Sequence, residues 1–321
     1  MQNRHLRRIS ALRAAHPLTY LLDMSALTVL LRLELHPHLT VFQRPRTITK
    51  RKITMQPLTK KILPLNIDGT PLQTAALFRT GSGVPLVFLH GFGSTKEDYA
   101  DLALHTEWDN HPFIAFDAPG CGETQCDDLT KISIPFLVKT ALAVLESFGV
   151  GRFHLVGHSM GGLTALMLAH QQPQRVASFI NIEGNIAPED CFLSRQIIEF
   201  ADNDEIRFFQ RFIERTYLAP AFSSALYAVS LPHKVRAGAV KPIFSSMVDL
   251  SDHGSLMEKF LGLPCPKMFM YGAQNAHLSY LPHIGRNGVV LSEIPHCGHF
   301  PMYSNPAAMW QSMAAFWATI N

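Results

Sequence analysis

One serine stands between glycines at a spacing that suits nucleophilic chemistry. The segment LVGHSMGG places Gly157, Ser159 and Gly161 in the pattern G-x-S-x-G, after an apolar run typical of a strand and before a helix-period segment. A sharp strand-to-helix turn needs small flanking residues, because larger side chains would clash there. Such a turn projects the serine hydroxyl above a sheet. The pattern therefore predicts that Ser159 is a nucleophile.

A histidine near the C-terminus is the candidate base. A serine hydroxyl is a poor nucleophile until an imidazole, oriented by a carboxylate, takes its proton. Of the 16 histidines, we choose His299, which follows the last expected strand and precedes the terminal helix. The run HCGH also suggests metal ligation by His296, Cys297 and His299. No complementary ligand cluster supports that interpretation, so no metal is expected.

Apolar runs alternate with helix-period segments from residue 85 onward. The expected strands are PLVFLHG, HPFIAFDAPG, RFHLVGH, RVASFINIEG, PKMFMYG and GVVLSEIP. Between most of them, apolar residues recur at three- and four-residue intervals, as they do in helices that face a core. This alternation predicts an α/β fold with a mostly parallel sheet and helices on both faces.

Four motifs together resemble the α/β-hydrolase superfamily. They are HGFG at 90–93, DAPGCGET at 117–124, GHSMGG at 157–162 and CGHFPMYSNP at 297–306, in the superfamily's order. The resemblance spans roughly residues 58–321. It implies an eight-stranded sheet and a serine nucleophile served by a histidine, and the GHF around His299 is similar to the superfamily's catalytic-histidine loop. It does not fix the substrate.

The acid of the expected triad is missing from the place where many members of the superfamily carry it. The loop after the penultimate strand, FMYGAQNAHLSY, contains no Asp or Glu, and Asn275 stands where an aspartate is expected. Some branches carry the acid one strand earlier, where this chain has Glu183. We therefore expect Glu183 to hold the Nδ1 proton of His299. The alternatives are Glu189, Asp190, Glu293, Asp249 and Asp252.

Two backbone amides are expected to bind the oxyanion that forms on the substrate. Met160 follows the nucleophile at a helix N-terminus, where the helix dipole favours an anion. Phe92, in HGFG, matches the superfamily's other donor position. Each such donor is worth about 3 kcal/mol in the transition state. This chemistry requires no metal or organic cofactor, so none is expected.

Composition narrows the class of protein further. The net charge of +3 depends on basic residues before Met55, so no nucleic-acid footprint remains in the rest of the chain. No apolar run reaches the roughly 18 residues of a membrane span, so no stable membrane insertion is expected. The five cysteines are scattered and form no CxxC pair, which argues against a disulfide framework and predicts a cytoplasmic location.

The chain divides into three expected parts. Residues 1–54 are Arg-rich and are predicted to be an N-terminal extension outside the fold, either a targeting segment or an over-extended start. Residues 55–186 and 259–321 should form the α/β-hydrolase core. Residues 187–258, the lid segment, are rich in aromatic residues and far longer than a crossover helix requires. They predict an inserted helical lid, with some of its rings lining an apolar pocket.

Together these features predict a serine hydrolase that cleaves a small or medium-sized carboxylic ester through an acyl-enzyme. The expected partner is a small apolar ester, and a homodimer is left open. One alternative is hydrolysis of a carbon–carbon bond in a diketo acid by the same triad. The other is a ligand-binding homologue that has lost turnover. Ser159 argues against epoxide hydrolysis and dehalogenation, because superfamily members with those activities use aspartate.

Overall fold

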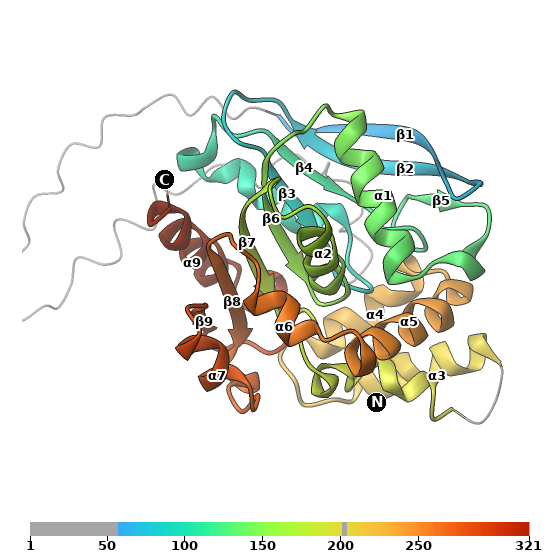
Figure 1. Cartoon of the computed structure of the whole chain (residues 1–321). Coiled ribbons are helices and arrows are strands. Elements are labelled where there is room, and N and C mark those ends of the chain that lie inside the picture. Colours follow the sequence, from blue (N-terminus) through green and yellow to red (C-terminus); the bar gives the residue numbers. More distant parts are fainter. Residues whose placement is uncertain (1–56, 201–203, 321) are drawn as a thin grey trace, which may run out of the picture. The chain divides into compact units, whose positions relative to one another are not determined.

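The computed structural model describes residues 57–200 and 204–320. Within them, nine strands form one sheet in the order β1-β2-β4-β3-β6-β7-β8-β9, with β5 paired to β2 (Figure 1). The strands are β1 Thr59–Ile67, β2 Thr70–Arg79, β3 Leu86–Leu89, β4 Phe113–Phe116, β5 Gln125–Cys126, β6 Phe153–His158, β7 Val176–Ile182, β8 Lys267–Gly272 and β9 Val290–Ile294. The predicted N-terminal extension, residues 1–54, lies outside the described residues.

The sheet is mostly parallel, which confirms the predicted fold class. Strands β4, β3, β6, β7, β8 and β9 pair in parallel, whereas β2 runs antiparallel to β1, β4 and β5. The main path among the described residues has the eight strands expected, and the two-residue β5 is an addition. Parallel strands end at a common edge, so the loops after β3, β6, β7, β8 and β9 lie near one another there.

Helices cover both faces of the sheet, as predicted. Adjacent residues of β3 point to opposite sides, because side chains alternate along a strand. Phe88 packs against Trp310 of α9 (Pro306–Ala318), with ring centroids 5.9 Å apart. Leu89 lines a small internal space together with Leu137 of α1 (Ile134–Ser147) and Met160 of α2 (Met160–Gln171). The remaining helices of the core are η1 Lys96–Leu104, η2 Thr106–Trp108, η3 Leu129–Lys131, η7 Ala273–Asn275, α7 Leu281–Arg286 and α8 Pro301–Ser304.

The lid segment is helical in its described residues. Its elements are η4 Pro188–Cys191, η5 Ser194–Ile197, α3 Glu205–Tyr217, α4 Ser224–Lys234, η6 Ala237–Ala239, α5 Val240–His253 and the start of α6 Leu256–Leu261. They connect β7 to β8, and Figure 1 shows α3, α4 and α5 grouped below the sheet. The function of this segment as a lid remains a prediction.

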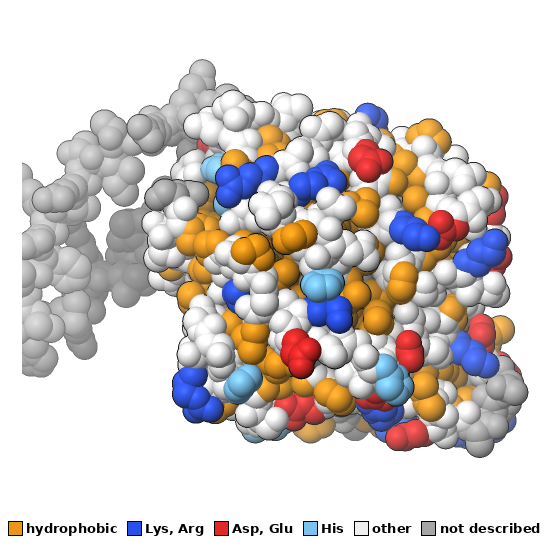
Figure 2. Space-filling model, viewed as in Figure 1, with side chains coloured by type: hydrophobic (Ala, Val, Ile, Leu, Met, Phe, Trp, Pro, Cys, Tyr) orange, Lys and Arg blue, Asp and Glu red, His pale blue; other side chains and the backbone are white. Residues whose placement is uncertain are grey.

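The surface carries charges of both signs. Figure 2 shows basic and acidic side chains interspersed with apolar ones on the face in view. In the part of the chain that the structure describes, no helix is both long and apolar enough to cross a membrane. The absence of a nucleic-acid partner remains a prediction.

Helix α2 approaches the end of β7 so closely that only glycine fits at the contact. A Cβ built on Gly162 would lie 2.6 Å from Cα of Gly184, and one built on Gly184 would lie 2.5 Å from Cα of Gly162. Real Cβ atoms do not come that close to backbone, so either side chain would push the helix away from the strand. This contact sets the distance between the turn that holds Ser159 and the strand end that holds Glu183.

We expect Gly162→Ala to lower the melting temperature, although alanine has the higher helix propensity. The added methyl group overpacks a backbone contact, which costs about 1–3 kcal/mol. The matched control is Gly151→Ala, because a Cβ at Gly151 meets nothing within 4 Å. Thermal unfolding followed by circular dichroism measures both variants. Equal melting temperatures for the two variants would contradict the packing argument.

Candidate active site

Ser159 lies in the sharp turn between β6 and α2. Its φ of 52° and ψ of −121° are rare for a residue with a side chain. Its N–H donates to the carbonyl of Ile182 at 2.9 Å, so β7 helps to hold the turn. A Cβ at Gly157 would lie 2.7 Å from Cβ of Ala165, and one at Gly161 would overlap the backbone at the end of β3. Packing therefore requires both glycines of the motif.

The structure brings Glu183 and His299 into direct contact. Oε2 of Glu183, which follows β7, lies 2.7 Å from Nδ1 of His299, in the loop after β9. Both side chains are largely buried, with 5% and 12% of their surfaces exposed. Oε1 of Glu183 accepts a hydrogen bond from the N–H of Gly272 at 2.7 Å. The carboxylate is thus fixed by β8 and is oriented toward the imidazole.

Asn275 donates to the carboxylate of Glu183. Its Nδ2 lies 2.7 Å from Oε2 of Glu183, the same oxygen that contacts His299. A carboxylate at position 275 would instead face a second carboxylate at hydrogen-bond distance, which is unfavourable for two charged groups. Asn275, at the position where an aspartate was expected, therefore fits a site whose acid is Glu183, one strand earlier.

The other groups that the sequence suggested have different partners. The partners are Ser279 for Glu189, Tyr280 for Asp190, Arg195 for Asp252, His253 for Asp249 and Tyr271 for Glu293. Cys297, from the HCGH run, is buried, and its Sγ lies 3.0 Å from the carbonyl of Gly298. Across the described ranges, no group of three or more His, Cys, Asp or Glu is placed to hold a metal ion.

His158 is a buried neighbour of the site that the sequence analysis missed. Its Nε2 donates to the carbonyl of His299 at 2.8 Å, which holds the backbone of the histidine loop. Burial, with a smaller contribution from the nearby His299, lowers the pKa of His158 well below its usual value. The ring therefore stays neutral with its proton on Nε2. In the sequence, only its position next to Ser159 could have indicated that His158 belongs to the site.

The two expected oxyanion donors lie at the ends of β3 and β6. Met160 is the first residue of α2, so its N–H has no acceptor within the helix. Phe92 follows β3, and its carbonyl accepts a hydrogen bond from the hydroxyl of Tyr227 at 2.9 Å. Burial raises the pKa of Tyr227 well above its usual value, so this phenol stays a donor. His90 supports the same loop, because its Nε2 accepts from the N–H of Ala118 at 2.8 Å.

A buried ion pair ties the loop after β3 to the DAPGCGET loop after β4. Nζ of Lys96 lies 2.8 Å from Oδ2 of Asp117, and the two side chains are 1% and 0% exposed. Burial lowers the pKa of Lys96, but hydrogen bonds to Asp117, Glu123 and Glu97 outweigh it and raise the pKa above its usual value. Gly122 has φ 53° and leaves no room for a Cβ beside Asp117. This motif is therefore an anchor for the loop that contains Phe92.

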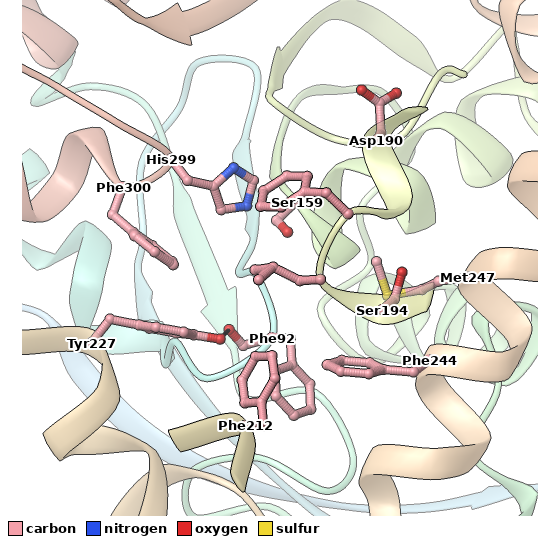
Figure 3. A pocket seen from close by; sticks show the side chains of 12 residues that line it. Phe92, Ser159, Asp190, Ser194, Phe212, Tyr227, Phe244, Met247, His299 and Phe300 are labelled. Atoms are coloured by element: carbon pink, nitrogen blue, oxygen red, sulfur yellow. Dashed lines mark hydrogen bonds between the residues drawn. The ribbon is translucent and has the colours of Figure 1, made fainter. Parts of the chain in front are cut away.

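Ser159 and His299 line the same small cavity (Figure 3). Its volume is about 20 Å³, and a cavity of roughly 10–15 Å³ already holds one water molecule. Figure 3 shows Ser159 and His299 at one end of the cavity and the rings of Phe212 and Phe244 at the other. The further lining residues are Phe92, Asp190, Phe192, Leu193, Ser194, Tyr227, Met247 and Phe300. The lid segment supplies many of these side chains.

Comparison with known proteins decides the family. A sequence profile described as the alpha/beta hydrolase family matches residues 86–311. The chain belongs to this family. Its solved relatives show the same fold at low identity. A carboxylesterase of the thaumarchaeon Nitrososphaera gargenis has a TM-score of 0.67 at 16% identity, and the match covers 80% of this chain and 98% of that one.

Two curated relatives share more of the sequence. The 2-hydroxy-6-oxononadienedioate/2-hydroxy-6-oxononatrienedioate hydrolase of Burkholderia vietnamiensis is 32% identical over 152 residues, which are 46% of this chain and 52% of that protein. The pimeloyl-(acyl-carrier protein) methyl ester esterase of Aeromonas salmonicida is 34% identical over 117 residues, which are 36% of this chain and 42% of that protein. The chain thus spans about half or less of the length of these relatives.

In this member of the alpha/beta hydrolase family, Asp190 lines the cavity, and Figure 3 shows its carboxyl group pointing away from Ser159 and His299. Its Oδ2 accepts from the N–H groups of Ile186 and Ala187 at 2.8 Å, and its Oδ1 accepts from the hydroxyl of Tyr280 at 2.7 Å. Burial raises the pKa of Asp190 to about 6, although these hydrogen bonds favour the charged form. The group therefore titrates close to neutral pH.

We expect Asp190→Asn to gain stability relative to the parent as the pH rises from about 4 to about 6. The folded protein holds the Asp190 proton up to a pKa of about 6, whereas an ordinary aspartate releases it near 3.8. The folded state therefore binds more protons than the unfolded chain in this window, and the parent loses stability as the pH rises. Melting temperatures of both proteins across the window test this. A difference that stays constant with pH would rule out the raised pKa.

Proposed function

We propose that the chain is a serine esterase that cleaves a carboxylic ester through an acyl-enzyme. The observation that carries this proposal is the 2.7 Å contact between Glu183 and Nδ1 of His299. It directs Nε2, the other ring nitrogen, to the cavity that Ser159 also lines. The Aeromonas relative, an esterase by name, supports the reaction type. The aromatic walls of the cavity suit an apolar ester.

The mechanism follows from these positions. His299 takes the proton of Ser159 as Oγ attacks the carbonyl carbon, and the oxyanion accepts hydrogen bonds from the N–H groups of Phe92 and Met160. The bond to the alcohol oxygen then breaks, and His299 gives its proton to that oxygen. In the second half, water attacks the acyl carbon and passes a proton to His299. The bond from the acyl carbon to Oγ then breaks, and His299 returns the proton to Oγ, which releases the acid and restores Ser159. Glu183 stabilises the imidazolium in both halves.

A second candidate is hydrolysis of a carbon–carbon bond, and the Burkholderia relative favours it. The name of that relative gives dioate substrates, which carry two carboxylates. A site for such an anion would be expected to contain a cation. Among the described residues that line the cavity at Ser159, none is Lys or Arg. A neighbouring cavity that His299 also lines does include a cation, Arg215. The lining beside Ser159 favours an uncharged ester, and the carbon–carbon reaction remains the alternative.

We expect Ser159→Ala to remove esterase turnover by several orders of magnitude while the melting temperature stays close to that of the parent, because the variant lacks the nucleophile and loses little packing. Hydrolysis of p-nitrophenyl acetate measures turnover. A fluorophosphonate probe should label the parent and not the variant. Residual turnover within about tenfold of the parent would overturn the assignment of the nucleophile.

We expect Glu183→Gln to lower kcat by about 10³–10⁴, because the amide keeps the shape but loses the charge that stabilises imidazolium. Asn275→Ala removes one hydrogen bond to Glu183, which is worth ~1 kcal/mol, so kcat should fall by about tenfold or less. Steady-state kinetics of both variants provide the comparison. The opposite order of severity would mean that the acid lies elsewhere.

The double variant Glu183→Gln/Asn275→Asp is a sharper control. Asn275→Asp alone places two carboxylates at hydrogen-bond distance and should lower activity. In the Glu183→Gln background the new carboxylate is the only one beside the imidazole, and part of the lost rate should return. If the double variant does not recover activity, and Glu183→Gln alone lowers kcat only mildly, the carboxylate of Glu183 has no role in the mechanism.

A further inference from the structure

We propose that the preferred substrate has a short acyl group and a large alcohol. This inference rests on the proposed esterase function and assigns the two sides of the ester to different parts of the site. The acyl side would accept little more than an acetyl group. The alcohol side would accept a chain of several carbons.

The reaction geometry decides which side of the ester faces which wall. The tetrahedral intermediate has four substituents: Oγ of Ser159, the oxyanion, the departing alcohol oxygen and the acyl chain. The oxyanion faces the N–H groups of Phe92 and Met160, and the alcohol oxygen must lie within reach of His299, which protonates it. The acyl chain therefore points away from His299, into the cavity that Ser159 and Phe92 share.

The wall on the acyl side is closed by packed aromatic rings. The ring centroids of Phe92 and Phe244 lie 4.6 Å apart, and those of Phe212 and Phe244 lie 5.7 Å apart. All three side chains are buried. Tyr227 is locked beside them by its hydrogen bond to the carbonyl of Phe92 and by stacking on Phe300 at 4.2 Å. A long acyl chain would have to displace this cluster, since the cavity holds only about 20 Å³.

The free space lies next to His299 instead. Two further cavities, of about 250 Å³ and about 380 Å³, both include His299 in their lining. Among the described residues, Ser159 and Phe92 line only the small cavity of the three. Phe192 lines all three, and its ring packs edge-on against that of His299 at 5.7 Å. The volume needed by a large group is thus available where the alcohol must leave.

The linings of the two larger cavities differ in charge. The 380 Å³ cavity has Glu183, Glu189 and Asp190 in its lining, and no Lys or Arg lines it in the described ranges. An anionic alcohol would be repelled there. The 250 Å³ cavity has apolar walls, among them Leu193 and Ala219, but Arg215 also lines it. The 380 Å³ cavity therefore suits a neutral alkyl or aryl group, whereas the 250 Å³ cavity could also hold a polar group beside Arg215.

The test is a pair of isomeric esters, hexyl acetate and ethyl hexanoate. They have the same formula and differ only in which side of the ester carries the long chain. We expect kcat/KM for hexyl acetate to exceed that for ethyl hexanoate by about tenfold or more, because the hexanoyl chain must displace packed side chains. Release of acid, followed by titration at constant pH, measures both rates. Equal rates, or faster cleavage of ethyl hexanoate, would overturn the proposal.

Failure of the proposed function gives a different result. If the chain is no esterase, neither isomer nor p-nitrophenyl acetate is cleaved in a Ser159-dependent way, and both proposals fall together. If p-nitrophenyl acetate is cleaved through Ser159 and the isomers show no preference for hexyl acetate, only the inference on the two sides of the site falls.

Variants locate the cause of the preference. Phe244→Ala should shrink the preference for hexyl acetate by opening the acyl side, and Met247→Ala provides a second opening of the same wall if Phe244→Ala does not fold. Phe222→Ala is the matched control, because Phe222 is a half-exposed ring of the same segment that lines none of the three cavities. The assignment of the acyl side would be overturned if both Phe244→Ala and Met247→Ala kept the full preference for hexyl acetate. It would also be overturned if Phe222→Ala lost as much of that preference as they do.

Discussion

The hydrogen bond between Glu183 and His299 is the constraint on which the site depends. A carboxylate must meet Nδ1 of the imidazole while Nε2 stays free for Ser159. The parallel sheet meets this requirement at its carboxyl edge. The backbone hydrogen bonds between neighbouring strands continue past the strand ends. The N–H of Ser159 donates to the carbonyl of Ile182, and the N–H of Glu183 donates to the carbonyl of Met270. Both residues have positive φ, 52° and 45°, which is rare for residues with a side chain.

Around that bond, two separate sets of contacts restrict the remaining parts of the site. The buried pair of Lys96 and Asp117 anchors the loop that carries Phe92 from the side of the core. Tyr227, on α4, holds the same loop from the side of the lid segment. The loop that contains Phe92 is thus held by elements far apart in the sequence. This arrangement helps to keep the space beside Ser159 small.

The sequence analysis located the parts of the site that depend on strand order and local turns. The spacing around Ser159 required a sharp turn, and the absence of acids near Asn275 directed attention to Glu183, which does contact His299. The roles of these residues remain proposals. The donation from Asn275 to Glu183 and the contact between Tyr227 and Phe92 were not predicted. They depend on side-chain packing between distant segments, which periodicity and spacing do not encode.

Proton NMR of the histidine rings tests the central interaction most directly. A ring N–H that donates to a buried carboxylate gives a strongly downfield resonance, and one such signal should belong to Nδ1 of His299. This resonance should appear in the parent and in Asn275→Ala, and it should be lost in Glu183→Gln with the fold retained. A resonance that survives Glu183→Gln would contradict the account, because the Nδ1 proton would then be held by another group.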